Sequence, residues 1–102
     1  MDRTDEVELT VHDVPEETRY EIREGERVLG FAVYRRRGDV TDFRHTEVDP
    51  DAGRSGVGGI LVRAALDDVR THGGAVVATC PFVRGWIDRH AEYADLLVRA
   101  DS

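Results

Sequence analysis

The first half of the chain consists of short segments in which apolar and polar residues alternate. Residues 7–11 predict a short strand, either an edge strand or a loose arm, because a proline-containing stretch interrupts it. Tyr20 and Ile22 alternate with charged residues and predict a half-buried strand. Residues 27–35 are apolar on both alternating faces, as in a central strand covered on both sides. With a further strand over 40–48, this half is expected to form an antiparallel meander.

The second half changes to helical spacing. Residues 56–71 predict a helix that "HGG" at 72–74 ends. The exposed side of this helix is expected to carry three charged residues: Arg63, Asp67 and Arg70. Residues 75–79 form a short, continuously apolar run, which is typical of a strand in a parallel pair. Residues 40–79 therefore predict a right-handed β-α-β unit.

The end of the chain predicts further helical structure. Pro81 suits the first turn of a helix, and apolar residues follow it at helical spacing. A last short helical piece is expected over 92–98. A length of 102 residues fits one compact domain. The predicted fold is of the mixed α/β (α+β) class, with an N-terminal strand or arm over residues 1–17 and the main domain over residues 18–102.

The charge of the chain narrows its partners. There are 14 basic residues, all arginine, against 21 acidic ones, and the formal net charge is −7. An acidic chain is a poor general binder of nucleic acid, because phosphate attraction supplies most non-specific affinity. Abundant carboxylates without lysine indicate a salt-adapted host, and a genome that favours arginine codons is the alternative.

The compartment follows from the cysteine content and from apolar runs. A single cysteine excludes an internal disulfide framework and fits a reducing cytoplasm. The sequence contains no run of 18 apolar residues, so no membrane span is predicted. The acidic N-terminal segment does not have the composition of a signal peptide. The expectation is a cytoplasmic protein without membrane contact.

The stretch "RSGVGGILVRAAL" places three glycines at the start of the predicted helix. Exposed N–H groups at a helix start, together with the helix dipole, bind phosphate groups. A Walker loop is excluded because it needs lysine, and a dinucleotide fingerprint would place its third glycine at Leu61. The competing interpretation is a flexible turn with close helix packing.

These glycines belong to a longer set of motifs that resembles a known family. "HTEV" closes a strand, the glycine-rich turn follows, and "CPF" precedes an aromatic residue and "HAEYADLL". Over roughly residues 18–97 the sequence resembles the short, single-domain subfamily of GNAT N-acetyltransferases. The resemblance implies a minimal GNAT fold and acetyl-CoA (CoA) as cosubstrate, with two parallel strands splayed to form the CoA groove.

The resemblance also implies where the cofactor would bind. In the family pattern Q/R-x-x-G-x-G/A, the two glycines fall on Gly56 and Gly58. The Q/R position falls on Gly53, a departure from the pattern, and Arg54 would supply the positive charge instead. Pantetheine would pair with the backbone near Val48. The full set of implied cofactor-binding residues is Val48, Gly53, Arg54, Ser55, Gly56, Val57, Gly58, Gly59, Phe82 and Trp86.

Two residues of the strand over 40–48 are candidates for proton transfer. His45 and Glu47 lie two positions apart, so they are expected to share one face with Phe43. Histidine titrates near neutral pH and is a natural general base. Glu47 would orient the imidazole or take the proton itself through water.

Cys80 and Tyr93 are candidates for giving a proton to the CoA sulfur as it departs. A thiol at the start of a helix is acidified by the helix dipole, so Cys80 would form an acyl-enzyme with His45 as partner or protonate the CoA sulfur. Tyr93 is the alternative proton donor. Cys80 as a small apolar packing residue is the competing interpretation. A zinc site that uses His45 and Cys80 is rejected because a third ligand is missing, so no metal is expected.

The predicted function is acetyl transfer from acetyl-CoA to an amine. The alternatives are a non-enzymatic CoA-binding module and a thiol hydrolase that uses Cys80, His45 and Glu47. The acceptor stays open; an acidic surface favours cationic acceptors such as lysine side chains or polyamines, although salt adaptation explains the acidity equally well. A monomer or a weak homodimer paired through an edge strand is expected.

Overall fold

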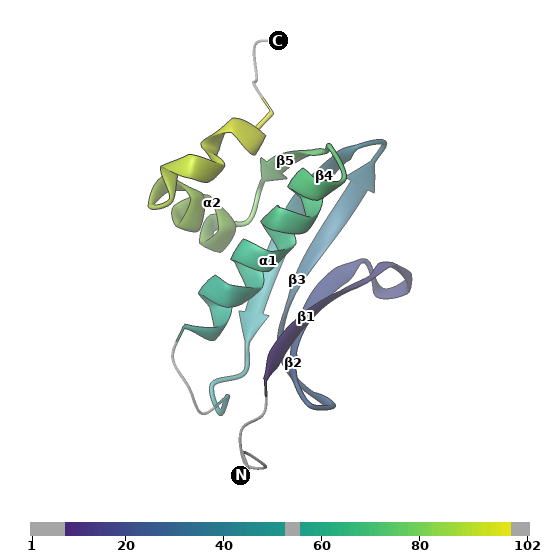
Figure 1. Cartoon of the computed structure of the whole chain (residues 1–102), viewed down its shortest axis with the longest axis vertical. Helices are drawn as coiled ribbons and strands as arrows, with labels where there is room; N and C mark the ends of the chain where they lie inside the picture. The colour runs from purple at the N-terminus through teal and green to yellow at the C-terminus, as the bar shows by residue number, and fades with distance from the viewer. Residues whose placement is uncertain (1–7, 53–55, 99–102) are drawn as a thin grey trace.

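The computed structural model describes residues 8–52 and 56–98, and in these ranges it contains one sheet and two α-helices (Figure 1). The elements are, in chain order, β1 (Leu9–Val14), the 3-10 turn η1 (Pro15–Glu17), β2 (Arg19–Glu24), β3 (Arg27–Arg37), β4 (Val40–Val48), α1 (Val57–Thr71), β5 (Ala75–Ala78), α2 (Pro81–Asp88) and the 3-10 turn η2 (Ala91–Leu96). No helix within the described residues is long and apolar enough to cross a membrane.

The five strands lie in the order β1-β2-β3-β4-β5. The first four pair antiparallel and β4 pairs parallel with β5, with α1 as the connection. The predicted meander and β-α-β unit are therefore confirmed. β1 is an edge strand of the same sheet and pairs along its length with β2.

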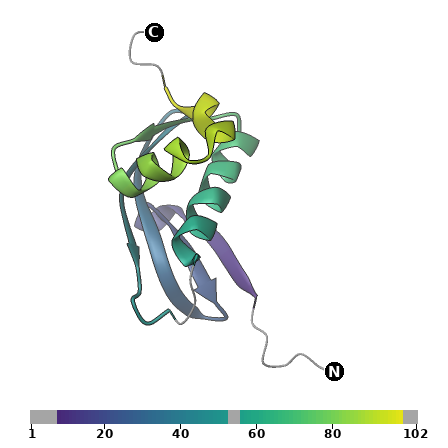
Figure 2. The same ribbon diagram turned by 90° about the vertical axis from the view of Figure 1, so that its left-hand side faces the viewer.

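Both helices lie on one face of the sheet (Figure 2). The apolar positions of α1 are buried, as the helical spacing predicts, and they are Val57, Leu61, Val62, Ala65, Leu66 and Val69. From α2, Val83 packs between α1 and the strand residues Ala32 and Phe43. One apolar core thus joins the two helices to the sheet, and burial of this area is the main stabilising contribution.

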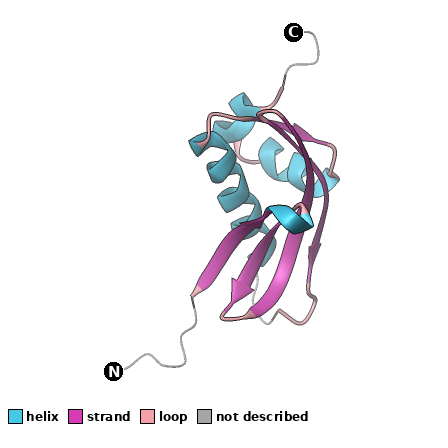
Figure 3. Ribbon diagram, turned by 90° about the vertical axis from the view of Figure 1, so that its right-hand side faces the viewer, coloured by secondary structure: helices cyan, strands magenta, loops and turns pink. Residues whose placement is uncertain are grey.

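No described helix packs on the other face of the sheet (Figure 3). The expectation that β3 is covered on both sides is therefore wrong. Phe31 of β3 is only half-buried, and the guanidinium of Arg19 lies 4.4 Å from its ring centroid. Arginine side chains cover apolar surface in this way while their charge stays in water. This uncovered side is called the open face below.

A β-bulge in β4 decides which of its side chains reach the open face. Phe43 pairs with Tyr34, but His45 pairs with the preceding residue Val33, so Arg44 has no partner on β3. An extra residue in one strand reverses the alternation of faces beyond it. Phe43 therefore points toward the helices, whereas His45 points to the open face.

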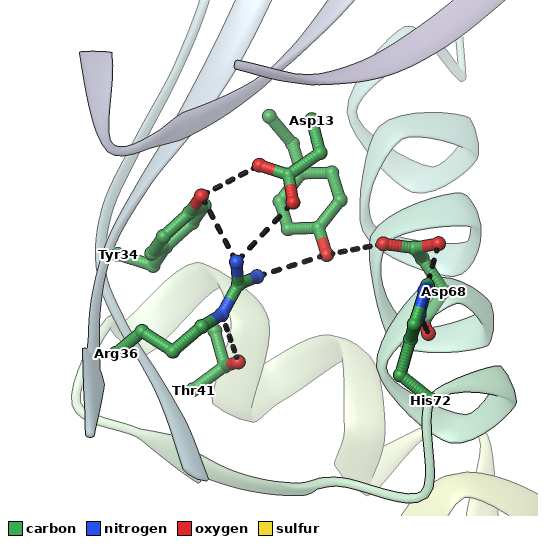
Figure 4. Close-up of polar contacts among 7 residues, drawn as sticks. Asp13, Tyr34, Arg36, Thr41, Asp68 and His72 are labelled. Carbon is green, nitrogen blue, oxygen red and sulfur yellow. Dashed lines mark hydrogen bonds and ion pairs between the residues drawn. The ribbon is translucent and has the colours of Figure 1, made fainter. Parts of the chain in front are cut away.

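A polar network fastens β1 to β3 and α1 (Figure 4). The hydroxyl of Tyr34 donates to Asp13 at 2.5 Å, and Arg36 donates to Asp13 at 3.2 Å. Arg36 also donates to the hydroxyl of Tyr20, which donates to Asp68 of α1 at 2.7 Å. The network borders a cavity of about 290 Å³ beside the turn between β3 and β4.

Burial affects the titration of the two tyrosines in this network. Desolvation, together with the hydrogen bond to Asp13, raises the pKa of Tyr34 to about 12. Desolvation, together with the hydrogen bond to Asp68, raises the pKa of Tyr20 as well. Both hydroxyls therefore keep their protons, which they donate to the carboxylates, throughout the neutral range.

Candidate cofactor groove and active site

The start of α1 presents backbone N–H groups for which the described residues provide no side-chain cap. Gly56 is the N-cap with φ 80°, and no side chain caps this helix start within the described residues. The N–H groups of Val57, Gly58 and Gly59 occupy the first turn, where an α-helix provides no acceptor. A side chain at Gly56 would meet no atom within 4 Å. These donors, the open space and the positive end of the helix dipole together form an arrangement that can bind an anion.

The other two glycines have a packing reason of their own. A Cβ at Gly58 would lie 2.7 Å from the ring of Phe82, and one at Gly59 would lie 3.4 Å from the indole nitrogen of Trp86. Close helix packing, the competing interpretation, therefore accounts for Gly58 and Gly59. Gly56 is the glycine whose conformation serves the turn itself.

A surface groove of about 370 Å³ continues from the helix start between α1 and α2. Its lining residues are Gly56, Gly59, Ile60, Arg63, Ala64, Asp67, Trp86 and His90. The rings of Trp86 and His90 stack with centroids 3.8 Å apart, and the guanidinium of Arg63 lies 5.2 Å from the indole centroid. Trp86 is itself only 4% exposed, so the exposed cation of this groove is Arg63, which can attract an anionic part of a ligand.

The parallel strands separate beyond Phe43. The β4–β5 ladder ends at the pair Phe43–Ala78, and the last bond across it is donated by the Cys80 N–H to the Phe43 carbonyl at 2.8 Å. β4 continues to Val48, and no described residue of β5 pairs with this extension. The side chain of Val48 reaches toward Gly58, so the gap between the strands opens next to the start of α1. The backbone of β4 beyond Phe43, which no described residue of β5 pairs with, can pair with an extended ligand.

Cys80 lies at this gap on the helix side of the sheet. Its side chain is buried, with 3% exposed, and its sulfur lies 3.4 Å from the hydroxyl of Thr46. It is also the N-cap residue of α2, with Pro81 in the first turn. The position at a helix start is as expected, but the side-chain partner is Thr46.

His45 and Glu47 lie together on the open face. The His45 Nε2 atom is 2.8 Å from a carboxylate oxygen of Glu47, and more than half of each side chain is exposed. The predicted pair is thus close in space. Phe43 does not share this face, contrary to expectation, because of the bulge at Arg44. Thr46 lies between them in sequence and points to the opposite side, toward Cys80, so the structure does not bring His45 and Cys80 together.

Tyr93 packs against α1. Its hydroxyl donates to Asp67 at 2.7 Å and accepts from Arg63 at 3.2 Å. The hydrogen bond to Asp67, with burial of the ring, raises the pKa of Tyr93. The hydroxyl proton of Tyr93, which a departing thiolate would need, is therefore engaged in a hydrogen bond to the Asp67 carboxylate. The exposed charged residues predicted on α1 also contact η2. Arg70, one of them, donates two hydrogen bonds to the carboxylate of Asp95 in η2.

Comparison with known proteins decides the family. A model of GCN5-related N-acetyl-transferases matches residues 19–96. The chain belongs to this family. The solution structure of a GCN5-like protein from Staphylococcus aureus has a TM-score of 0.66 and 22% identity, and covers 92% of this chain and 90% of that one. A search of curated protein sequences finds no match.

Membership in the GNAT family supports an acyl-transfer function for the chain. Three implied cofactor residues, Gly53, Arg54 and Ser55, lie outside the described residues. The sequence did not single out Thr46, because its partner Cys80 lies 34 residues away and the bulge before Thr46 is visible only in the pairing of β4 with β3. Within the described parts of the chain no three metal-ligating side chains gather into a possible metal site.

Proposed function

We propose that the protein transfers the acetyl group of acetyl-CoA directly to an amine. The observation that carries this proposal is the uncapped, glycine-lined start of α1 beside the gap between β4 and β5. The cofactor fits these residues, because its diphosphate needs backbone donors and its pantetheine arm needs a free strand edge. Val48, Phe82 and Trp86 border that path, and the N–H groups of the first turn would hold the diphosphate.

Acetyl-CoA supplies an activated acetyl group when it is bound. The chain must then accept a proton from the amine as the new C–N bond forms and must direct a proton to the sulfur as the C–S bond breaks. His45 is the proposed base, because it is exposed on the open face and Glu47 holds its imidazole. Cys80 lies on the helix side of the gap and is the proposed proton source for the sulfur.

Direct transfer is favoured over an acyl-enzyme for a geometric reason. A cysteine nucleophile needs a base within hydrogen-bond reach, and the partner of the Cys80 sulfur is the hydroxyl of Thr46. The same separation of Cys80 from His45 and Glu47 argues against the thiol hydrolase. Tyr93 has no part in the proposal, because its proton is donated to Asp67.

The test combines calorimetry with thiol release. We expect heat of binding with CoA and acetyl-CoA, and release of free thiol that depends on added amine. His45→Gln should lower kcat by about 10²-fold or more, which is the usual contribution of a general base. His12→Gln is the matched control, since His12 is an exposed histidine on the edge strand β1 whose partner is Thr10.

Cys80→Ala separates the chemical routes. Direct transfer predicts that acetylation persists in this variant, with at most a modest loss from slower protonation of the sulfur. Complete loss of turnover with intact CoA binding would contradict this expectation, and an acetylated Cys80 detected by mass spectrometry of the wild-type chain would then favour the acyl-enzyme. Tight CoA binding with no turnover on any amine would contradict the enzyme and favour a binding module.

A further inference from the structure

Besides the groove between α1 and α2, the structure has a groove on the open face, near the proposed base His45. It has a volume of about 350 Å³ and lies where β3, β4 and β5 meet. Its lining residues are Arg35, Arg37, Val40, Asp42, Arg44 and Val77, and it is called the arginine groove below. Three guanidinium groups thus face one carboxylate, in a chain whose net charge is −7.

Two of these arginines are available to a ligand. Arg35 and Arg37 form no ion pair with another described residue, and both are exposed. Arg44 is bound to Asp42 at 2.9 Å, and Thr79 also donates to Asp42 at 2.7 Å. Burial opposes the charge on Asp42, but the hydrogen bonds from Thr79 and Arg44 hold its pKa below the usual range. Asp42 therefore compensates Arg44, and the guanidinium groups of Arg35 and Arg37 have no carboxylate partner within residues 8–52 and 56–98.

The groove lies near the His45–Glu47 pair along the strands β3 and β4. Val33 of β3 pairs with His45, and Arg35, two residues further along the same face, pairs with Asp42. Residues two apart on a strand are separated by about 7 Å. Arg35 thus begins one side-chain step from His45, and both side chains emerge on the face that no described helix covers.

The two sides of the sheet divide the reactants. The helix start, Phe82 and Val48 lie on the helix side, where the proposed function places acetyl-CoA. An amine can approach the gap between β4 and β5 from the open face, where His45 is exposed. An acceptor in that position has the guanidinium groups of Arg35 and Arg37 within reach of its other end.

We infer that the acceptor is a small amine that also carries an anionic group, a carboxylate or a phosphate, and that the arginine groove binds this group while His45 faces the amine. Guanidinium groups bind both anions through paired hydrogen bonds. The local charge thus opposes the cationic acceptors that the overall composition favours. A large polyanion is disfavoured because the rest of the chain is acidic. The inference rests on the proposed function.

Matched amines test the inference. Acetylation of γ-aminobutyrate is compared with that of γ-aminobutyramide, and ethanolamine phosphate with ethanolamine, so the two pairs distinguish carboxylate from phosphate. We expect kcat/KM for at least one anionic member to exceed that of its neutral counterpart by about tenfold at low salt, from two partly exposed ion pairs. The preference should shrink as ionic strength rises.

Variants locate the preference in the groove. Arg35→Gln with Arg37→Gln should remove the preference, so that the anionic and neutral members of each pair react with similar kcat/KM. Arg84→Gln on α2 with Arg89→Gln at its C-cap makes the same change in net charge outside the arginine groove and should preserve the preference. Equal rates within both pairs, or a preference that survives loss of Arg35 and Arg37, would overturn the inference.

A binding measurement separates this inference from the proposed function. The amide NMR signals of Val40 and Val77 are followed while the acetylated product, N-acetyl-γ-aminobutyrate, is added. Shifts that are seen in the wild-type chain and disappear in the Arg35→Gln, Arg37→Gln variant support anion binding in the arginine groove. If these shifts occur but no amine is acetylated, the proposed function alone is contradicted. Acetyl transfer without preference and without these shifts defeats the inference alone.

Discussion

Replacing Gly56 by alanine tests whether the start of α1 is a diphosphate site or merely a turn. Gly56 has φ 80°, and a Cβ there would meet nothing within 4 Å. The substitution therefore adds backbone strain without a clash. Gly38, in the turn between β3 and β4, has φ 56° and equally open surroundings. Gly38→Ala is thus a control that is matched in conformation and lies at the opposite end of β4 from Val48.

The two variants should lose similar stability. An alanine in the left-handed region costs roughly 1–2 kcal/mol, and the less flexible unfolded chain offsets about 0.4–1 kcal/mol of this. We expect each substitution to lower the free energy of unfolding by about 1 kcal/mol, measured by chemical denaturation without ligand.

CoA binding should separate the two variants. A hydrogen bond to a charged group contributes about 1.5–3 kcal/mol, so displacing one N–H from the diphosphate weakens CoA binding by roughly 10- to 100-fold. Calorimetry should show this loss for Gly56→Ala and unchanged affinity for Gly38→Ala. Saturation at about 100 times Kd should stabilise the wild-type chain by about 2.7 kcal/mol, and Gly56→Ala by much less at the same concentration. Equal affinities in the two variants would refute the diphosphate site.

Three further predictions concern stability. Leu61→Ala should lower the free energy of unfolding by about 2–5 kcal/mol because Leu61 is fully buried, whereas Ile60→Ala, at a position that is 45% exposed, should change it by about 0.5 kcal/mol or less; similar losses in thermal denaturation would contradict the burial pattern. The raised pKa of Tyr34, about 12, contributes stability that is present below pH 10 and lost as the pH rises toward 12, so alkaline titration should show a smaller loss for Tyr34→Phe. Glu21 is buried, and although burial opposes its charge, hydrogen bonds from neighbouring arginines lower its pKa. Its contribution to stability is present above its usual pKa of 4.5 and is lost as the pH falls below it. A Glu21→Gln variant that loses as much stability in acid as the wild-type chain would disprove this.

Local patterns were sufficient for most of the fold. Alternation and helical spacing predicted the meander, the helix that begins after Gly56 and the parallel strand that follows it, because each pattern reflects one buried face. The pattern over 27–35 was misread as two covered faces, since Phe31 is covered by an arginine from β2 rather than by a helix. That contact depends on which strands become neighbours.

The candidate site was only partly accessible from the sequence. The helix start could be predicted because the backbone donors, the glycines and the helix dipole are all local features. The separation of His45 from Cys80 could not, because a single extra residue at Arg44 reverses the faces of β4 and is visible only in its register with β3. The hydrogen bond from Tyr93 to Asp67 could not be predicted either, because the two residues lie 26 positions apart in the sequence.

The sequence by itself thus determined the order of the elements, since helices and strands follow from short-range spacing, and its motifs indicated the family that the comparison confirms. Only the tertiary structure decided which side of the sheet each functional side chain occupies. It also decided that Arg35 and Arg37 remain without a carboxylate partner among the described residues, although acidic residues outnumber arginines along the chain. The physical reason is that the face of a strand and the pairing of a charge depend on contacts between residues far apart in sequence.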